Sequence, residues 1–140
     1  MSQPLPRGID RSGLDAAFEA DEAHKSNLIL QARLLRDQNQ DEPAARNFAE
    51  AAEIEERLSD HCAERGLLEK SFVHRFSAAS CWAQAGNFYQ AIAICDELLA
   101  CGELPDQQRL DVEQYAETLR RRRAQLYADL ALAGTTGSDG

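Results

Sequence analysis

The apolar residues of this chain recur at steps of three and four positions, and short polar or glycine-containing segments interrupt the pattern. This spacing places apolar side chains on one face of a helix, so it predicts helices rather than strands. We expect five helical segments, at residues 14–38, 42–65, 67–85, 88–101 and 106–133. Because short connections make successive helices antiparallel neighbours, either a stack of helical hairpins or a helical bundle would satisfy the pattern.

Residues with known preferences at helix ends mark several of these boundaries. Ser12 is the expected N-cap of the first helix, with Asp15 three residues later as its capping-box partner. Asp41 is expected to cap the second helix. Gly66 and Gly86 are expected to end the second and third helices, since glycine readily adopts the left-handed conformation that follows a helix.

Composition supports the same fold class. Alanine and leucine dominate the apolar set, whereas valine occurs only at Val73 and Val112. β-Sheets favour β-branched residues, so this bias argues against them. The sequence therefore predicts one all-α domain of about five helices over residues 13–133, between flexible tails at residues 1–12 and 134–140.

The stretch AQAGNFYQAIAICDELL, at residues 83–99, resembles the turn and second helix of a tetratricopeptide repeat. In that family a glycine opens the turn, an aromatic residue follows, and a small residue five positions after the glycine permits close helix packing. Gly86, Phe88 and Ala91 occupy these positions. A weaker copy, which lacks the turn glycine, begins at Asn27 and puts Ala45 in the role of Ala91. The resemblance implies a right-handed stack of antiparallel α-hairpins, closed by a long C-terminal capping helix.

The resemblance also implies a binding groove, because the first helix of each hairpin lines the concave surface in this family. Family members that clamp a peptide's C-terminal carboxylate place lysine, asparagine and arginine there, and this sequence has apolar and small residues instead. An apolar groove would suit an amphipathic or extended peptide. The same side chains could also pack beneath the final helix, and the sequence leaves that alternative open. The expected groove residues are Leu30, Leu34, Val73, Phe76, Ser80 and Ala83.

The final helix offers a second candidate surface around four consecutive arginines. Four successive residues point around most of a helix's circumference, so they cannot form one flat phosphate-binding face. The arginines also interrupt the apolar stripe, which predicts that the helix leaves the core there. Its second half would be solvated, bind an acidic partner, or pair with its copy in a structural homodimer. The residues of this surface are Leu119, Arg120, Arg121, Arg122, Arg123, Leu126 and Leu130.

Charge and reactive residues limit the possible functions. The net charge of −9 argues against a protein that grips nucleic acid or an anionic membrane. Among the histidines no pair has the four-residue spacing of two metal ligands on one helix, and a site built from His61, Cys62 and Cys81 would have to form across helices. No phosphate-binding glycine loop and no nucleophile motif occur. We therefore expect no enzyme, no metal and no cofactor.

The four cysteines bear on the cellular compartment. The N-terminal residues show no apolar signal-peptide region, so the cysteines are expected to be reduced and buried in a cytoplasmic protein. The sequence thus favours a non-enzymatic, cytoplasmic protein-protein interaction module, adaptor-like or chaperone-like, that binds a peptide or partner helix in an apolar groove. A homodimer built through the C-terminal helix is the alternative, and a small metal protein or enzyme is less favoured.

Overall fold

A computed structural model describes residues 15–137 of the chain, which form five α-helices and contain no strand. The all-α class and the number of helices are therefore confirmed. The helices are α1 (Ala16–Asp37), α2 (Asp41–Glu64), α3 (Leu68–Gln84), α4 (Phe88–Ala100) and α5 (Asp106–Gly137).

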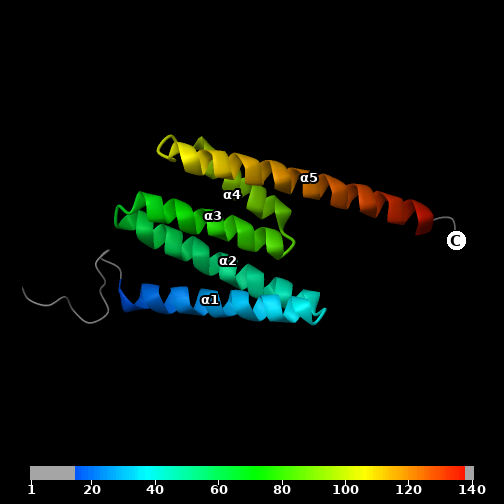
Figure 1. Cartoon of the computed structure of the whole chain (residues 1–140), viewed down its shortest axis with the longest axis horizontal. Coiled ribbons are helices and arrows are strands. Elements are labelled where there is room, and N and C mark those ends of the chain that lie inside the picture. Colours follow the sequence, from blue (N-terminus) through cyan, green and yellow to red (C-terminus); the bar gives the residue numbers. More distant parts are fainter. Residues whose placement is uncertain (1–14, 138–140) are drawn as a thin grey trace, which may run out of the picture.

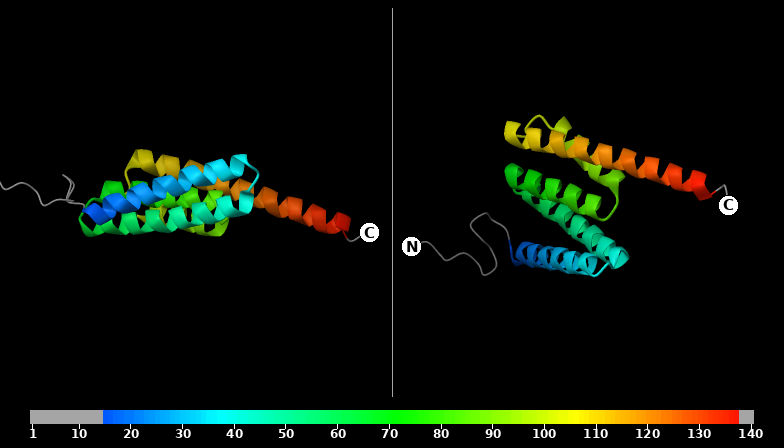
Figure 2. Two further views of the ribbon diagram at one scale, coloured as in Figure 1. Left: turned by 90° about the horizontal axis from the view of Figure 1, so that it is seen from below. Right: turned by 45° about the vertical axis from the view of Figure 1, so that its right-hand side comes forward.

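The helices follow one another in an antiparallel zigzag, and each packs mainly against its neighbours in sequence (Figure 1). α1, α3 and α5 lie on one side of the zigzag, which we call the odd-helix face, and α2 and α4 lie on the other (Figure 2). Residues of α1, α3 and α5 line a common hollow, which agrees with this arrangement. α5 extends well beyond the ends of the other four helices (Figure 1).

The three tight turns of the zigzag share one backbone conformation. Gly66 and Gly86 adopt positive φ angles of 74° and 86°, and Asn39 adopts 61° at the equivalent point between α1 and α2. After each of them, the next residue donates its N–H to a carbonyl near the end of the preceding helix, at 2.8–2.9 Å. Asparagine enters this region more readily than most residues. Asn39 therefore forms this turn in the weaker repeat copy, which lacks the glycine.

The starts of the first two helices differ from the prediction. Asp15 is itself the N-cap of α1, because its Oδ1 accepts the N–H of Phe18 at 3.0 Å; the proposed cap, Ser12, lies outside the described residues. Asp41 is the first residue of α2 rather than its cap, since the turn at Asn39 ends one residue earlier. The cap position is Gln40, whose side chain makes no capping hydrogen bond.

This shift also changes the correspondence between the two hairpins. Ala44 and Ala91 are both fully buried, and both donate their N–H to the residue before the helix, Gln40 and Asn87 respectively. The counterpart of Ala91 is therefore Ala44 rather than Ala45, which is half-buried.

The last helix differs most from the prediction. It continues to Gly137, four positions beyond the expected end at Ala133, because extending a formed helix avoids the cost of nucleating one. Of the three leucines named as candidates on this helix, Leu119 is buried, whereas Leu126 and Leu130 are exposed, as is Leu110 nearer its start. The buried stripe consists of Val112, Ala116 and Leu119.

Candidate functional site

An apolar pocket of about 190 Å³ opens between α3 and the first turns of α5. Phe72 and Phe76, four residues apart on α3, form one wall, and Val112 of α5 contributes to the other. Val73 lies at the pocket with 51% of its surface exposed. The complete lining is Phe72, Val73, Phe76, Ser77, Leu104, Gln108, Asp111 and Val112.

The turn between α4 and α5 fixes the α5 side of the pocket. Arg109 donates two hydrogen bonds back across the turn, to the carbonyl oxygens of Leu99 at 2.7 Å and Cys101 at 2.8 Å. Leu104, within the turn, is buried against the core and forms one end of the pocket. A charged donor with two backbone acceptors fixes the turn more firmly than neutral hydrogen bonds would.

One polar atom in this pocket is left unsatisfied. The amide oxygen Oε1 of Gln108 is buried, and it has no hydrogen-bond donor among the described residues. A buried acceptor without a donor costs about 1–3 kcal/mol.

A polar hollow of about 420 Å³ lies further along the odd-helix face. Its lining includes Arg36 of α1, Ser80 and Gln84 of α3, and Tyr115 and Arg122 of α5. The guanidinium of Arg36 is held by two hydrogen bonds to Gln84, at 3.0 Å to Oε1 and 2.9 Å to the backbone oxygen. The hollow thus gathers two positive charges from separate helices in an otherwise acidic protein.

Phe76 and Tyr115 connect the pocket to the hollow. Their rings meet edge to face, with centroids 5.3 Å apart and planes at 71°. A third depression lies beside this pair and shares Phe76 and Asp111 with the pocket, and Tyr115 with the hollow. Burial raises the pKa of Tyr115 despite a hydrogen bond with Ser80, so the hydroxyl remains protonated near neutral pH. The odd-helix face therefore carries one interrupted groove, apolar at one end and cationic at the other.

The predicted groove residues fall into two groups. Those of α3 lie along this groove: Val73 and Phe76 line the pocket, and Ser80 and Ala83 line the hollow. Leu34 of α1 lines a separate shallow depression, and Leu30 is exposed outside the pockets described here. The structure therefore brings together the α3 residues but not the α1 leucines.

Sequence reasoning missed the residues that complete the groove from outside α3. These are Leu104 at the end of the pocket, Gln108 with its unsatisfied oxygen, and Arg36. Arg122, which also lines the hollow, was predicted only on the surface of the final helix. No periodicity signal identifies these residues, because each reaches the groove through the packing of a different helix.

A buried polar cluster, also missed from the sequence, joins α1, α2 and α3. Glu55 of α2 is almost fully buried, and its Oε1 lies 3.2 Å from Nζ of Lys25 and 3.4 Å from Nδ1 of His74. Nε2 of the same histidine lies 3.6 Å from Glu22. Burial raises the pKa of Glu55, but the hydrogen bond with His74 and the charge of Lys25 outweigh it, so the pKa lies below its usual value. Lys25 and His74 therefore stabilise a carboxylate that lies in the core.

Three of the four cysteines are buried thiols. Cys62, Cys81 and Cys95 are buried, and burial raises the pKa of each thiol, to about 11 for Cys81 and Cys95. Such thiols carry little thiolate at neutral pH and are poor nucleophiles. Within residues 15–137 no group of three or more histidine, cysteine or acidic side chains is arranged to hold a metal ion.

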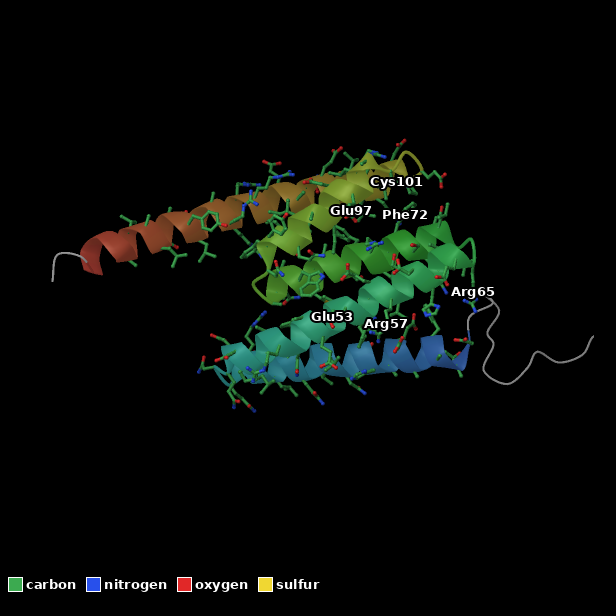
Figure 3. All side chains as sticks on the ribbon, turned by 180° about the vertical axis from the view of Figure 1, so that it is seen from behind. Glu53, Arg57, Arg65, Phe72, Glu97 and Cys101 are labelled. Atoms are coloured by element: carbon green, nitrogen blue, oxygen red, sulfur yellow. The ribbon has the colours of Figure 1, made fainter. Side chains whose placement is uncertain are left out.

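Figure 3 shows the opposite face, where α2 and α4 lie in front. A shallow depression there is lined by residues of α2, α3 and α4, including Phe72, Glu97 and Cys101, which the figure labels. Its lining mixes charged, polar and apolar side chains, and it contains no buried atom without a hydrogen-bond partner among the described residues.

Two findings on the whole chain complete the description. None of the helices in the described part of the chain is long and apolar enough to cross a membrane. Comparison of the chain with models of protein families, with curated proteins and with solved structures found no match.

Proposed function

We propose that this chain is a non-enzymatic, tetratricopeptide-like interaction module that binds a peptide or partner helix along the odd-helix face. An apolar side chain of the partner enters the pocket between α3 and α5, and an acidic group lies towards Arg36 and Arg122 in the hollow. The observation that carries the proposal is the mainly apolar pocket between α3 and α5, which has Phe72 and Phe76 along one wall and exposed Val73 beside it.

The repeated turns support the tetratricopeptide-like assignment. The α1–α2 and α3–α4 hairpins close through the same positive-φ turn, at Asn39 and Gly86, and each places a fully buried alanine in the first turn of its second helix. Cysteines that form no disulfide suit a reducing compartment, which agrees with a cytoplasmic location.

The test compares two exposed positions on the same helix. Val73→Glu places a carboxylate in the mouth of the pocket, and Leu68→Glu, at a similarly exposed leucine that lines the opposite depression, serves as the matched control. Partners would be captured from native extract with wild type and both variants, after circular dichroism has shown that each variant is folded. We expect a partner that wild type and Leu68→Glu retain and Val73→Glu loses. Retention by Val73→Glu would contradict the proposal.

Gln108→Met tests the buried oxygen itself. Methionine keeps the length of the side chain but removes the unsatisfied oxygen, so the protein should become more stable by about 1 kcal/mol. Urea denaturation measures the change, and equal or lower stability would contradict the description of Gln108 as unsatisfied.

A further inference from the structure

The stripe of apolar residues on α5 extends beyond the part of the helix that packs against the core. Val112, Ala116 and Leu119 face the core, and after a step of seven residues, which contains the four arginines, the stripe resumes at Leu126 and Leu130. Because an α-helix turns about 100° per residue, these five residues lie on one side of the helix. Leu119 is fully buried, whereas Leu126 and Leu130 are 42% and 59% exposed.

The change from buried to exposed occurs on α5 between Leu119 and Leu126. α4 packs against α5, and Asp96 of α4 forms a salt bridge with Arg120 of α5 at 2.6 Å. Beyond it α5 runs on to Gly137, about 25 Å further, clear of the other helices (Figure 1). The surface that α4 covers in the first half is therefore uncovered in the second.

The projecting half also differs in charge from the rest of the protein. Residues 120–137 contain four arginines and a single acidic residue, Asp129, which gives them a net charge of +3. Since the whole chain carries −9, the remaining residues carry −12. The contact between α4 and α5 already shows how the protein covers this helix, with apolar side chains on the stripe and a carboxylate on an arginine.

We propose that the projecting half of α5 binds an acidic amphipathic helix of another protein, which continues the position of α4 along the stripe. Its apolar residues cover Leu126 and Leu130, and its carboxylates pair with Arg122 and Arg123, since Arg120 and Arg121 already form salt bridges with Asp96 and Glu117. A second copy of α5 fits less well, because the pair would bring two segments of charge +3 together. Nucleic acid also fits less well, since four consecutive arginines point around most of the helix and form no single phosphate-binding face.

The experiment measures binding of a defined probe to the full chain by fluorescence anisotropy. The probe is a labelled synthetic peptide of about 18 residues, with leucines at helical spacing and glutamates at the flanking positions. A second peptide, with lysine in place of each glutamate, controls for charge. We expect the glutamate peptide to bind at least about ten-fold more tightly, with an affinity that falls as salt rises.

Paired variants identify the surface. Leu126→Gln/Leu130→Gln removes the stripe while keeping good helix-forming residues, and should weaken binding about ten-fold or more. Leu132→Gln is the matched control, because Leu132 is 67% exposed and lies roughly opposite the stripe, so binding should persist. Val73→Glu should also leave it unchanged, which separates this site from the groove on the odd-helix face.

Several outcomes would overturn the proposal. Equal binding of the two peptides would remove the charge argument, and unchanged binding by the Leu126→Gln/Leu130→Gln variant would place the contact elsewhere. If sedimentation equilibrium showed that wild type is a dimer and that this variant is a monomer, the stripe would bind a second copy of the chain. Tighter binding of a single-stranded oligonucleotide than of the glutamate peptide would assign the arginines to nucleic acid.

Discussion

Replacement of Glu55 by alanine should destabilise the fold strongly. The carboxylate is 1% exposed and lies within 3.4 Å of both Lys25 and His74, whereas Lys25 is 20% exposed. At an effective dielectric constant of about 20, the Lys25–Glu55 attraction is about 5 kcal/mol before desolvation is subtracted. Removing one member of a buried pair typically costs about 3–5 kcal/mol, because the other is left buried and unpaired. Lys25 can partly reach water, so we expect about 3 kcal/mol.

Urea denaturation followed by far-ultraviolet circular dichroism measures this change. Glu53→Ala, an exposed position on the same helix, is the matched control and should change stability by less than about 0.5 kcal/mol. Glu55→Gln, which keeps the shape and an acceptor oxygen, should fall between the two. The double variant Glu55→Ala/Lys25→Ala should cost less than the sum of its single changes, by at least about 1 kcal/mol. Additive losses, or a loss for Glu55→Ala equal to that of Glu53→Ala, would refute the reasoning.

The Glu55 carboxylate also makes the stability of the fold depend on pH. The pKa of Glu55 is lower in the folded protein than its usual value of 4.5, so the unfolded chain takes up this proton first as the pH falls. The stabilisation is therefore complete above about pH 4.5 and is lost as the pH falls through the folded-state pKa. Wild type should lose stability more steeply than Glu55→Gln over this range. Lys25, His74 and Glu22, which complete the cluster, remain the same in both proteins.

Three other perturbations probe the turns, the core and the thiols. Gly86→Ala should lower stability by about 1–2 kcal/mol in urea denaturation, because φ is +86° although no atom lies within 4 Å of the added methyl group; an unchanged midpoint would contradict this. Leu119→Ala should cost about 2–5 kcal/mol in the same assay, since the side chain is fully buried between α4 and α5, and a loss under about 1 kcal/mol would show that the site collapses around the smaller residue. Iodoacetamide at neutral pH, followed by peptide mass mapping, should modify half-buried Cys101 before Cys81 and Cys95, whose pKa values are about 11; equal rates in the native protein would exclude the burial described.

The helices could be predicted because their signals are local. Apolar spacing and the glycines at 66 and 86 placed most ends within a residue or two of those observed. The turn at Asn39 was harder, since only the backbone angle shows that an asparagine does what glycine does elsewhere. The one-residue offset that moved the buried alanine from position 45 to 44 followed directly from that turn.

The candidate sites were predicted only in part, because they depend on contacts between distant residues. Val73 and Phe76 were found from their own helix, but Gln108 joins them only after α5 folds back beside α3. Nothing in the local sequence distinguishes Glu55 from the other acidic residues of α2, because its burial depends on two partners from other helices. Periodicity could mark the stripe through Leu126 but could not show what covers it.

The zigzag arrangement has a consequence for how the chain folds. Since each helix packs mainly against the next one in sequence, most tertiary contacts close short stretches of chain. Low contact order favours rapid folding, and a linear array can begin to form at any adjacent pair and spread from there. The interior pair, α2 and α3, has a neighbouring helix on both sides, whereas α1 and α5 lie at the ends of the array and each pack mainly against one helix. Local unfolding therefore starts at α1 or at α5, and unfolding of α5 also removes the projecting surface.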